Sequence, residues 1–219
     1  MRFPRNFNST RPEGINMDTR KKWDRTARFY DIFTAPMDAM GLVKWRKMLF
    51  SEIPEGFILE IGVGTGKNIE FYPERNRKYF CIDISRKMLD RAELKARKHG
   101  KKVDLVRMDA ENMQLPAGKF NCIVASCVFC SVPDPVKGLE EVRRVLKYDG
   151  VVLFLEHMRP KNRMLGRVFD ALNPITSGLF GFNINRKTVE NIKAAGFEIL
   201  EERNLLLDIF RLIRARPAR

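Results

Sequence analysis

The sequence predicts an α/β protein with a Rossmann-like, doubly wound, mostly parallel seven-stranded sheet whose last strand is antiparallel. Between residues 56 and 155, short apolar runs typical of buried strands alternate with segments of helical periodicity. That alternation implies crossover connections and a parallel sheet with helices on both faces. A glycine-rich loop directly follows the first run, where open α/β sheets bind their ligands. The length of 219 residues accommodates one such domain and not two.

The core elements follow from local sequence. Buried strands are expected where apolar and β-branched residues run together, at 56–61, 78–83, 103–108, 120–125 and 151–155. Ser85 is suited to cap a helix that continues to about residue 99 with an apolar inner face. A second helix over 136–146 leads through Asp149 and Gly150 into the fifth strand.

Two further regions flank this core. Residues 17–53 alternate basic and large apolar side chains, which predicts two helices with a break near Pro36. After the fifth strand, an insertion over 157–185 has helical spacing between residues 164 and 172 and a bend at Pro174. A last helix over 186–195 ends at Gly196, and closing strands at 198–201 and 205–213 can pair antiparallel. Residues 1–16 are expected to form a flexible tail, so 17–219 make up a single domain.

The composition of the chain limits which partners and which cellular compartment are expected. The formal net charge of +14 favours anionic partners such as nucleic acid, lipid headgroups or acidic metabolites, and a solvated basic surface is the alternative. No apolar run approaches the ~18 residues needed to span a bilayer, and the first residues lack the apolar segment of a signal peptide. The four cysteines form no disulfide framework. We therefore expect a cytoplasmic protein, soluble or peripheral on the inner face of the membrane.

The loop at residues 62–66 is the most informative segment, because Gly62, Gly64 and Gly66 occupy every second position. Bare backbone there lets an adenosine-bearing ligand lie against the chain without meeting a Cβ atom. A nicotinamide-binding loop carries its third glycine one residue later, where this chain has Lys67. The pattern indicates an adenosine cofactor without a pyrophosphate, and a tight structural turn is the alternative.

Two carboxylates follow the next two strands. Asp83 ends the second strand about 20 residues after the loop, where a carboxylate can accept hydrogen bonds from both ribose hydroxyls. Asp109 follows the third strand and is placed to meet an adenine amino group, with the backbone N–H of Ala110 beside it.

Together these motifs resemble the class I S-adenosylmethionine-dependent methyltransferase family. The similarity extends from about residue 30 to 214, with its most specific stretches at 60–66, 83–85, 109–112 and 139–147. Within the family the chain resembles the ubiquinone/menaquinone C-methyltransferases, the small phosphatidylethanolamine N-methyltransferases and the membrane-associated alkyl-thiol methyltransferases. Residues 129–132 and 154–157 are most similar to the thiol branch, although Asp149 stands where that branch usually has a glycine.

The resemblance implies S-adenosyl-L-methionine as cofactor and assigns roles to segments and residues. It makes 17–53 a helical lid, 54–156 the cofactor-binding core and 157–185 the acceptor-site insertion. Tyr30 falls where the lid folds over the methyl group, and a core aromatic is the alternative. Glu60 is implied to orient the methionine amino group directly or through water, and Ser126 to lie beside the methionine tail. The residues implied to bind the cofactor are Glu60, Gly62, Gly64, Gly66, Asp83, Ile84, Asp109, Ala110 and Ser126.

Two features near the fifth strand are candidates for chemistry on the acceptor. His157 stands just past the strand's carboxyl end, where it could take a proton from a thiol, amine or phenol, and a structural histidine is the alternative. Cys127 and Cys130 form a single CxxC, which is poor evidence for zinc. The two thiols could bind arsenite, or simply line an apolar pocket. Methyl transfer needs no metal, and we expect none.

These observations predict methyl transfer to a small amphiphilic acceptor: a phospholipid amine, an isoprenoid quinol or an alkyl thiol. An anionic membrane surface is a further expected partner, because the segments flanking the site are basic and amphipathic. RNA methylation ranks lower, since no base-flipping motif follows the fourth strand and no RNA-binding domain is appended. Arsenite methylation and a non-catalytic cofactor-binding protein are the remaining alternatives. The oligomeric state and the atom methylated are left open.

Overall fold

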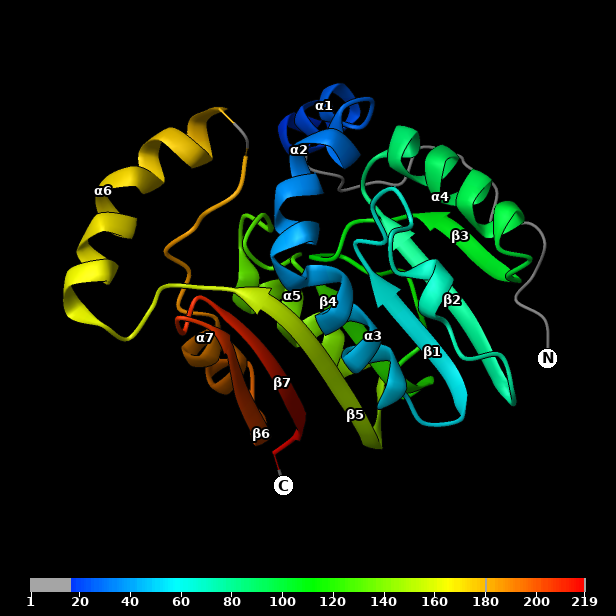
Figure 1. Ribbon diagram of the computed structural model, residues 1–219. Helices are drawn as coiled ribbons and strands as arrows, with labels where there is room; N and C mark the ends of the chain where they lie inside the picture. Colours follow the sequence, from blue (N-terminus) through cyan, green and yellow to red (C-terminus); the bar gives the residue numbers. More distant parts are fainter. Residues whose placement is uncertain (1–16, 180, 219) are drawn as a thin grey trace.

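A computed structural model describes residues 17–179 and 181–218 (Figure 1). The tail predicted for residues 1–16 lies outside this range. Seven strands form one sheet in the order β3-β2-β1-β4-β5-β7-β6. Strand β7 pairs antiparallel with both of its neighbours, and the other described pairings are parallel. This confirms the predicted fold class. The strands are β1 (Gly56–Ile61), β2 (Arg77–Asp83), β3 (Val103–Arg107), β4 (Phe120–Ser126), β5 (Leu146–His157), β6 (Phe197–Leu206) and β7 (Phe210–Pro217).

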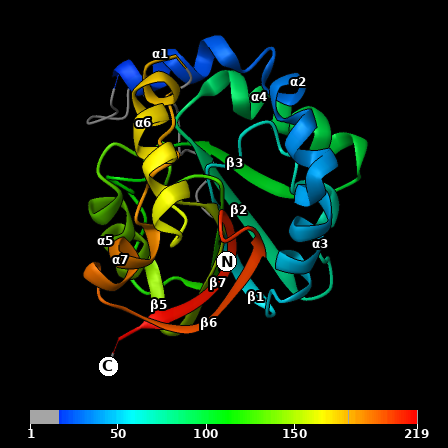
Figure 2. The ribbon, with the colours of Figure 1, turned by 60° about the vertical axis from the view of Figure 1, so that its left-hand side comes forward.

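Helices cover both faces of the sheet and divide the core in two. Helices α3 (Val43–Ser51) and α4 (Arg86–Lys98) lie on one face, and α5 (Pro135–Val145) and α7 (Thr188–Ala194) on the other (Figure 2). Successive residues of β1 and β4 point alternately into the two apolar clusters. Ser85 caps α4 as predicted, because its hydroxyl accepts a hydrogen bond from the N–H of Met88 at 3.2 Å.

The N-terminal region is helical, but the predicted break near Pro36 is wrong. The chain forms α1 (Met17–Thr26), α2 (Tyr30–Met37) and a π-helical turn, η1 (Asp38–Leu42), before α3. Pro36 lies inside α2, and the kink falls at Gly41, whose φ is +125°. A proline removes one backbone hydrogen bond, and the wider turn that follows it accommodates the change. Trp45 is buried, as its spacing predicted, and packs on Phe210 at 5.2 Å between ring centroids.

Ion pairs fasten this N-terminal region to the loop after β1. The ammonium of Lys67 lies 2.5 Å from a carboxylate oxygen of Asp38, whose other oxygen lies 2.5 Å from the guanidinium of Arg46. Asp31 accepts a hydrogen bond from the hydroxyl of Thr65 at 2.6 Å and pairs with Lys95 at 2.9 Å. Thr65 and Lys67 flank the last loop glycine, so the region is held against the glycine-rich loop itself.

The elements after the fourth strand differ from the prediction in their bounds. Strand β5 begins at Leu146, which pairs with Phe120, and the pairing with β4 resumes at Val151 opposite Cys122. The expected turn at Asp149 and Gly150 is therefore an irregularity inside the strand. The turn between β6 and β7 falls at Leu207 and Asp208, later than expected, and both have positive φ. Helix α6 (Arg163–Leu179) continues through Pro174, where a bend was predicted. Among the described helices, none is both long and apolar enough to cross a membrane.

The Asp38 pairs predict a measurable contribution to stability. Replacing Asp38 with Ala leaves two largely buried cations, Lys67 and Arg46, without their carboxylate, with side-chain exposures of 14% and 8%. We expect the free energy of unfolding to fall by roughly 3 kcal/mol in Asp38→Ala, measured by urea denaturation. Asp90→Ala breaks the exposed Arg86–Asp90 pair on α4 and should change stability little. Equal small effects in the two variants would show that the Asp38 pairs are not structural.

Candidate functional site

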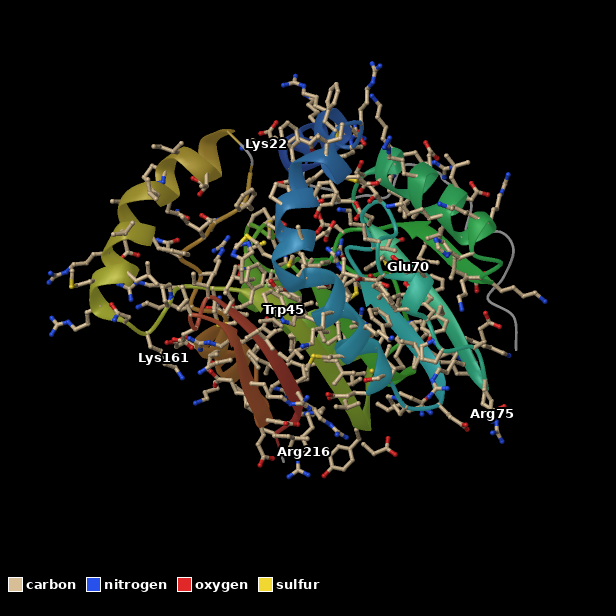
Figure 3. All side chains as sticks on the ribbon, viewed as in Figure 1. Lys22, Trp45, Glu70, Arg75, Lys161 and Arg216 are labelled. Atoms are coloured by element: carbon tan, nitrogen blue, oxygen red, sulfur yellow. The ribbon has the colours of Figure 1, made fainter. Side chains whose placement is uncertain are left out.

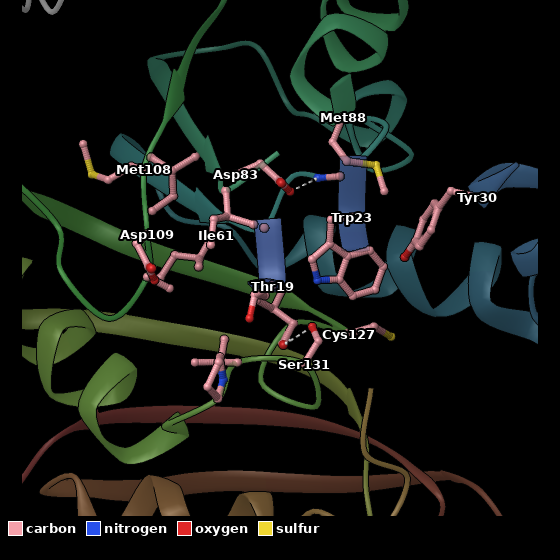
Figure 4. Close-up of a pocket in the computed structure, with 18 residues that line it drawn as sticks. Thr19, Trp23, Tyr30, Ile61, Asp83, Met88, Met108, Asp109, Cys127 and Ser131 are labelled. Carbon is pink, nitrogen blue, oxygen red and sulfur yellow. Dashed lines mark hydrogen bonds between the residues drawn. The ribbon is translucent and has the colours of Figure 1, made fainter. Parts of the chain in front are cut away.

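A pocket lies at the edge of the sheet where β1, β2, β3 and β4 end, beneath the N-terminal helices (Figure 4). It brings together the glycine-rich loop, the two predicted carboxylates and one face of α1. Its position matches the switch point at which open α/β sheets bind ligands. The lining residues are Thr19, Trp23, Tyr30, Ile61, Gly62, Gly64, Ile82, Asp83, Ile84, Met88, Met108, Asp109, Ala110, Cys127, Val128, Ser131, Val132 and Pro133.

Gly64 and Gly66 are each required to be glycine, for different physical reasons. At Gly64, with φ of +55°, a Cβ atom would meet nothing nearer than a backbone oxygen at 3.9 Å, so the pocket side of its backbone is open. At Gly66, with φ of +81°, a Cβ atom would approach the Cα of Ala92 to 2.9 Å, so this glycine lets α4 pack against the loop. A single 3₁₀ turn, η2 (Ile69–Phe71), follows the loop instead of an α-helix. No helix N-terminus is therefore offered there to a pyrophosphate.

Both carboxylate oxygens of Asp83, in the pocket lining, are held by backbone hydrogen bonds. One carboxylate oxygen accepts the N–H of Gly64 at 2.9 Å (Figure 4), and the other accepts the N–H of Ser85 at 2.9 Å. Each oxygen keeps further acceptor capacity for a ribose hydroxyl. Burial raises the pKa of Asp83 to about 6, against the two backbone hydrogen bonds that lower it.

The charge of the pocket is opposite to that of the chain. The chain carries +14, yet the described residues lining the pocket include Asp83 and Asp109 and neither a lysine nor an arginine. Such a lining suits a cationic ligand and lacks the cations that hold phosphate. The methionines Met88 and Met108 and the ring of Trp23 supply apolar surface for a flat base. The residues present therefore fit S-adenosylmethionine, which carries an adenosine, a sulfonium and no phosphate.

Four of the predicted residues lie outside the pocket lining: Glu60, Gly66, Ser126 and His157. Glu60 is buried, and its two oxygens accept hydrogen bonds from the side-chain amide of Asn68 at 2.7 Å and from the hydroxyl of Tyr72. Burial raises the pKa of Glu60 to about 7, although both hydrogen bonds act to lower it. Glu60 does not line the pocket, so of its two predicted modes of contact with the methionine amino group, direct or through water, only the water-mediated one fits this arrangement.

Helix α1 contributes two pocket residues, Thr19 and Trp23, that the sequence did not single out. The rings of Trp23 and Tyr30 meet edge to face at 6.0 Å, and together they close the side of the pocket opposite the sheet (Figure 4). Asp24, next to Trp23, accepts a hydrogen bond from the Ser85 hydroxyl at 2.6 Å. A large aromatic on a helix predicted to be a lid was the only sequence signal for this wall.

His157 was predicted to lie just past the carboxyl end of the fifth strand, and it is the last residue of β5. Its ring lies among phenylalanines. Phe182 and Phe210 contact it edge to face at 5.7 and 6.0 Å. Burial lowers the pKa of His157 to about 4, so the imidazole is neutral at physiological pH. The neutral imidazole can accept a proton, but it is packed against the Phe182 ring and does not line the pocket.

The loop after β4 is positioned by Glu156, which sequence reasoning did not select. One oxygen of this buried carboxyl accepts the N–H groups of Val128 and Phe129 at 2.9 and 3.2 Å. Its second oxygen has no hydrogen-bond partner among the described residues, and burial raises the pKa of Glu156 to about 7. Glu156 thus anchors the backbone that presents Cys127, Val128 and Ser131 to the pocket.

The two loop cysteines are free and lie in unlike surroundings. Cys127 lines the pocket, whereas Cys130 is buried and its thiol bonds the carbonyl of Cys127 at 3.5 Å. Burial raises the pKa of both thiols, that of Cys127 to about 12, so both are protonated. Metals and metalloids bind thiolates, and no third metal-ligating side chain joins the pair within the described residues.

Comparison with known proteins agrees with this geometry. The model of the methyltransferase domain family matches residues 59–154. The thiol S-methyltransferase TMT1B of Rattus norvegicus is 32% identical over 165 residues, covering 69% of this chain and 67% of that protein. A phosphatidylethanolamine N-methyltransferase of Cereibacter sphaeroides is 34% identical over 119 residues, covering 53% and 58%. A solved S-adenosylmethionine-dependent methyltransferase of Thermotoga maritima shares the fold, with a TM-score of 0.66, 22% identity and coverage of 90% and 99%. The chain spans between 42% and 67% of the thiol methyltransferases it matches.

The Asp83 geometry predicts how cofactor binding responds to mutation and pH. Asp83→Ala should weaken binding of S-adenosylhomocysteine by roughly 2–3 kcal/mol, because the ribose hydroxyls lose a charged acceptor in a buried place. In the parent, affinity should also fall as the pH drops through about 6, since protonation removes the carboxylate charge. Calorimetry measures both effects, and Asp104→Ala, on the neighbouring strand β3, is the control. Unchanged affinity in Asp83→Ala would remove Asp83 from the site.

Proposed function

The chain belongs to the class I S-adenosylmethionine-dependent methyltransferases, and from that premise we propose that its acceptor is a small amphiphilic molecule: a phospholipid amine, an isoprenoid quinol or an alkyl thiol. The observation that carries the proposal is a pocket whose ionisable lining is acidic at one end and which is apolar toward the loop after β4. Val128, Val132 and Pro133 form that apolar wall. Two relatives point the same way, since their names give a thiol and phosphatidylethanolamine as acceptors.

When bound, S-adenosylmethionine supplies a methyl group on a positively charged sulfur, open to in-line displacement by a nucleophile. The chain's contribution is mainly to bind and orient. In the proposed arrangement Asp83 and Ile84 hold the ribose and the base, Asp109 and Ala110 face the adenine edge, and the loop backbone passes beneath. Trp23 and Tyr30 cover the pocket and exclude water, which favours a step that consumes a positive charge.

Proton removal from the acceptor is assigned to His157 in this proposal, with Tyr30 positioned over the methyl group. Support comes from the neutral state of the imidazole and its place at the end of β5, one residue beyond Glu156.

We also propose that the acceptor is met at an anionic membrane surface. The support is the net charge of +14 together with exposed apolar side chains of the N-terminal helices, including Ile32 and Met40, 69% and 59% exposed. Phe182 packs edge to face against His157 and is not counted among these exposed side chains, and Phe180 lies outside the described residues.

A panel of acceptors tests the proposed function. We expect methyl transfer from S-adenosylmethionine to at least one of three classes: alkyl thiols, isoprenoid quinols and phosphatidylethanolamine in vesicles. Transfer is followed as radioactive product extracted into organic solvent. Arsenite and unmodified RNA are tested as acceptors in the same assay. Turnover of RNA or arsenite alone would overturn the proposal in favour of that alternative.

The assignment of His157 predicts a specific kinetic change. His157→Gln should lower kcat by about 10²–10⁴ while leaving cofactor affinity unchanged, because only the proton acceptor is lost. Phe210→Leu alters the packing around the ring without removing the imidazole and serves as the control. If His157→Gln turns over as fast as the parent, His157 has a structural role only.

A further inference from the structure

Helix α6 exposes a stripe of large apolar side chains. The exposed fractions are 79% for Met164, 51% for Val168, 45% for Leu172 and 55% for Ile175. These positions follow one another by four, four and three residues, so they share one face of the helix. A solvated helix normally buries such a stripe.

The contacts that hold α6 to the protein are polar. Asp170 forms a bidentate ion pair with Arg159, whose Nη2 and Nε atoms lie 2.8 and 3.1 Å from the two carboxylate oxygens. The side chain of Asn173 bonds the side chain of Asn183 at 3.1 Å and the backbone N–H of Ile184 at 2.9 Å. Helix α6 makes no extended contact with another described helix or strand, and it stands apart from the sheet at the edge where the parallel strands end (Figure 1).

From this arrangement we propose that the α6 stripe, defined as Met164, Val168, Leu172 and Ile175, docks into the interfacial layer of an anionic lipid bilayer. The proposal rests on the proposed function for its purpose, because an amphiphilic acceptor dissolves in that layer. A row of apolar side chains on a helix that lies in the membrane plane can enter the boundary between headgroups and acyl chains.

The positive charges near the α6 stripe favour anionic lipid over a second copy of the chain as the surface that covers it. Arg163 and Arg167, on the same helix, are exposed and form no ion pair among the described residues. Lys161, just before the helix (Figure 3), is also exposed but pairs with Glu202 at 3.3 Å. Anionic lipid attracts such cations. A second copy of the chain would bring another +14 against them, which opposes self-association through this face.

The stripe is also connected to the site. The chain that leaves α6 returns to the pocket loop, where Asn183 donates to the carbonyl of Cys130 from its backbone at 2.8 Å and from its side chain at 3.2 Å. Phe182 beside it packs on His157. Docking of α6 therefore brings the acceptor side of the pocket to the lipid surface, whereas the cofactor pocket stays under α1.

Vesicle co-sedimentation tests the proposal. The parent should bind phosphatidylglycerol vesicles, bind phosphatidylcholine vesicles far less, and be released by added salt. Met164→Ser with Leu172→Ser should lower the partition coefficient at least tenfold. Both side chains are exposed, so folding should be unaffected. The matched control is Leu94→Ser with Leu207→Ser, whose side chains are 65% and 76% exposed on other elements.

Three results would overturn the docking proposal: a parent that stays in the supernatant at low salt, an α6 double variant that binds like the parent, or a dimer in sedimentation equilibrium that the α6 double variant dissolves. The proposed function is judged separately, by calorimetry with S-adenosylhomocysteine and by methyl transfer to a water-soluble thiol without vesicles. The α6 double variant should keep both of these properties and lose only its activity on vesicle-borne acceptor.

Discussion

The two backbone hydrogen bonds accepted by Asp83 are the constraint on which the site depends. They tie the loop after β1, through Gly64, to the start of α4, through Ser85. The Ser85 hydroxyl in turn caps α4 and donates to Asp24 of α1. One short segment at the end of β2 thus fixes the cofactor loop, a core helix and the helix that covers the pocket.

Buried acids with raised pKa values gather near this edge of the sheet. Burial raises the pKa of Glu60 and Glu156 to about 7 and that of Asp83 to about 6. A buried carboxylate without a cation is costly, and hydrogen bonds offset only part of that cost. Of the three, only Asp83 lines the pocket. A cationic cofactor bound there would favour the ionised form of Asp83, so cofactor binding and ionisation of this carboxyl would favour each other. The high positive charge of the chain lies elsewhere, on its surface.

The N-terminal helices and α6 are attached to the rest of the protein in different ways. The lid is fastened to the cofactor loop by paired charges, with Lys67, Asp38 and Arg46 largely buried. Helix α6 is held by polar contacts along one side only, and its apolar stripe faces outward. The N-terminal helices thus cover the pocket within the fold, whereas the apolar stripe of α6 is left exposed.

The sequence by itself determined the order of strands and helices, the glycine-rich loop and the carboxylates that follow β2 and β3. These depend on side-chain periodicity and on residues close together in the chain, so local pattern suffices to predict them. It did not locate the kink at Gly41 or the turn at Leu207 and Asp208, because packing and pairing partners, and not propensity, choose among several permitted breaks. Tertiary structure alone decided that Trp23 walls the pocket, that Glu156 anchors the loop after β4 and that His157 is enclosed by Phe182 and Phe210. Each of these depends on segments remote in sequence meeting in space, and their burial, which sets the pKa values of Glu156 and His157, exists only once the chain has folded.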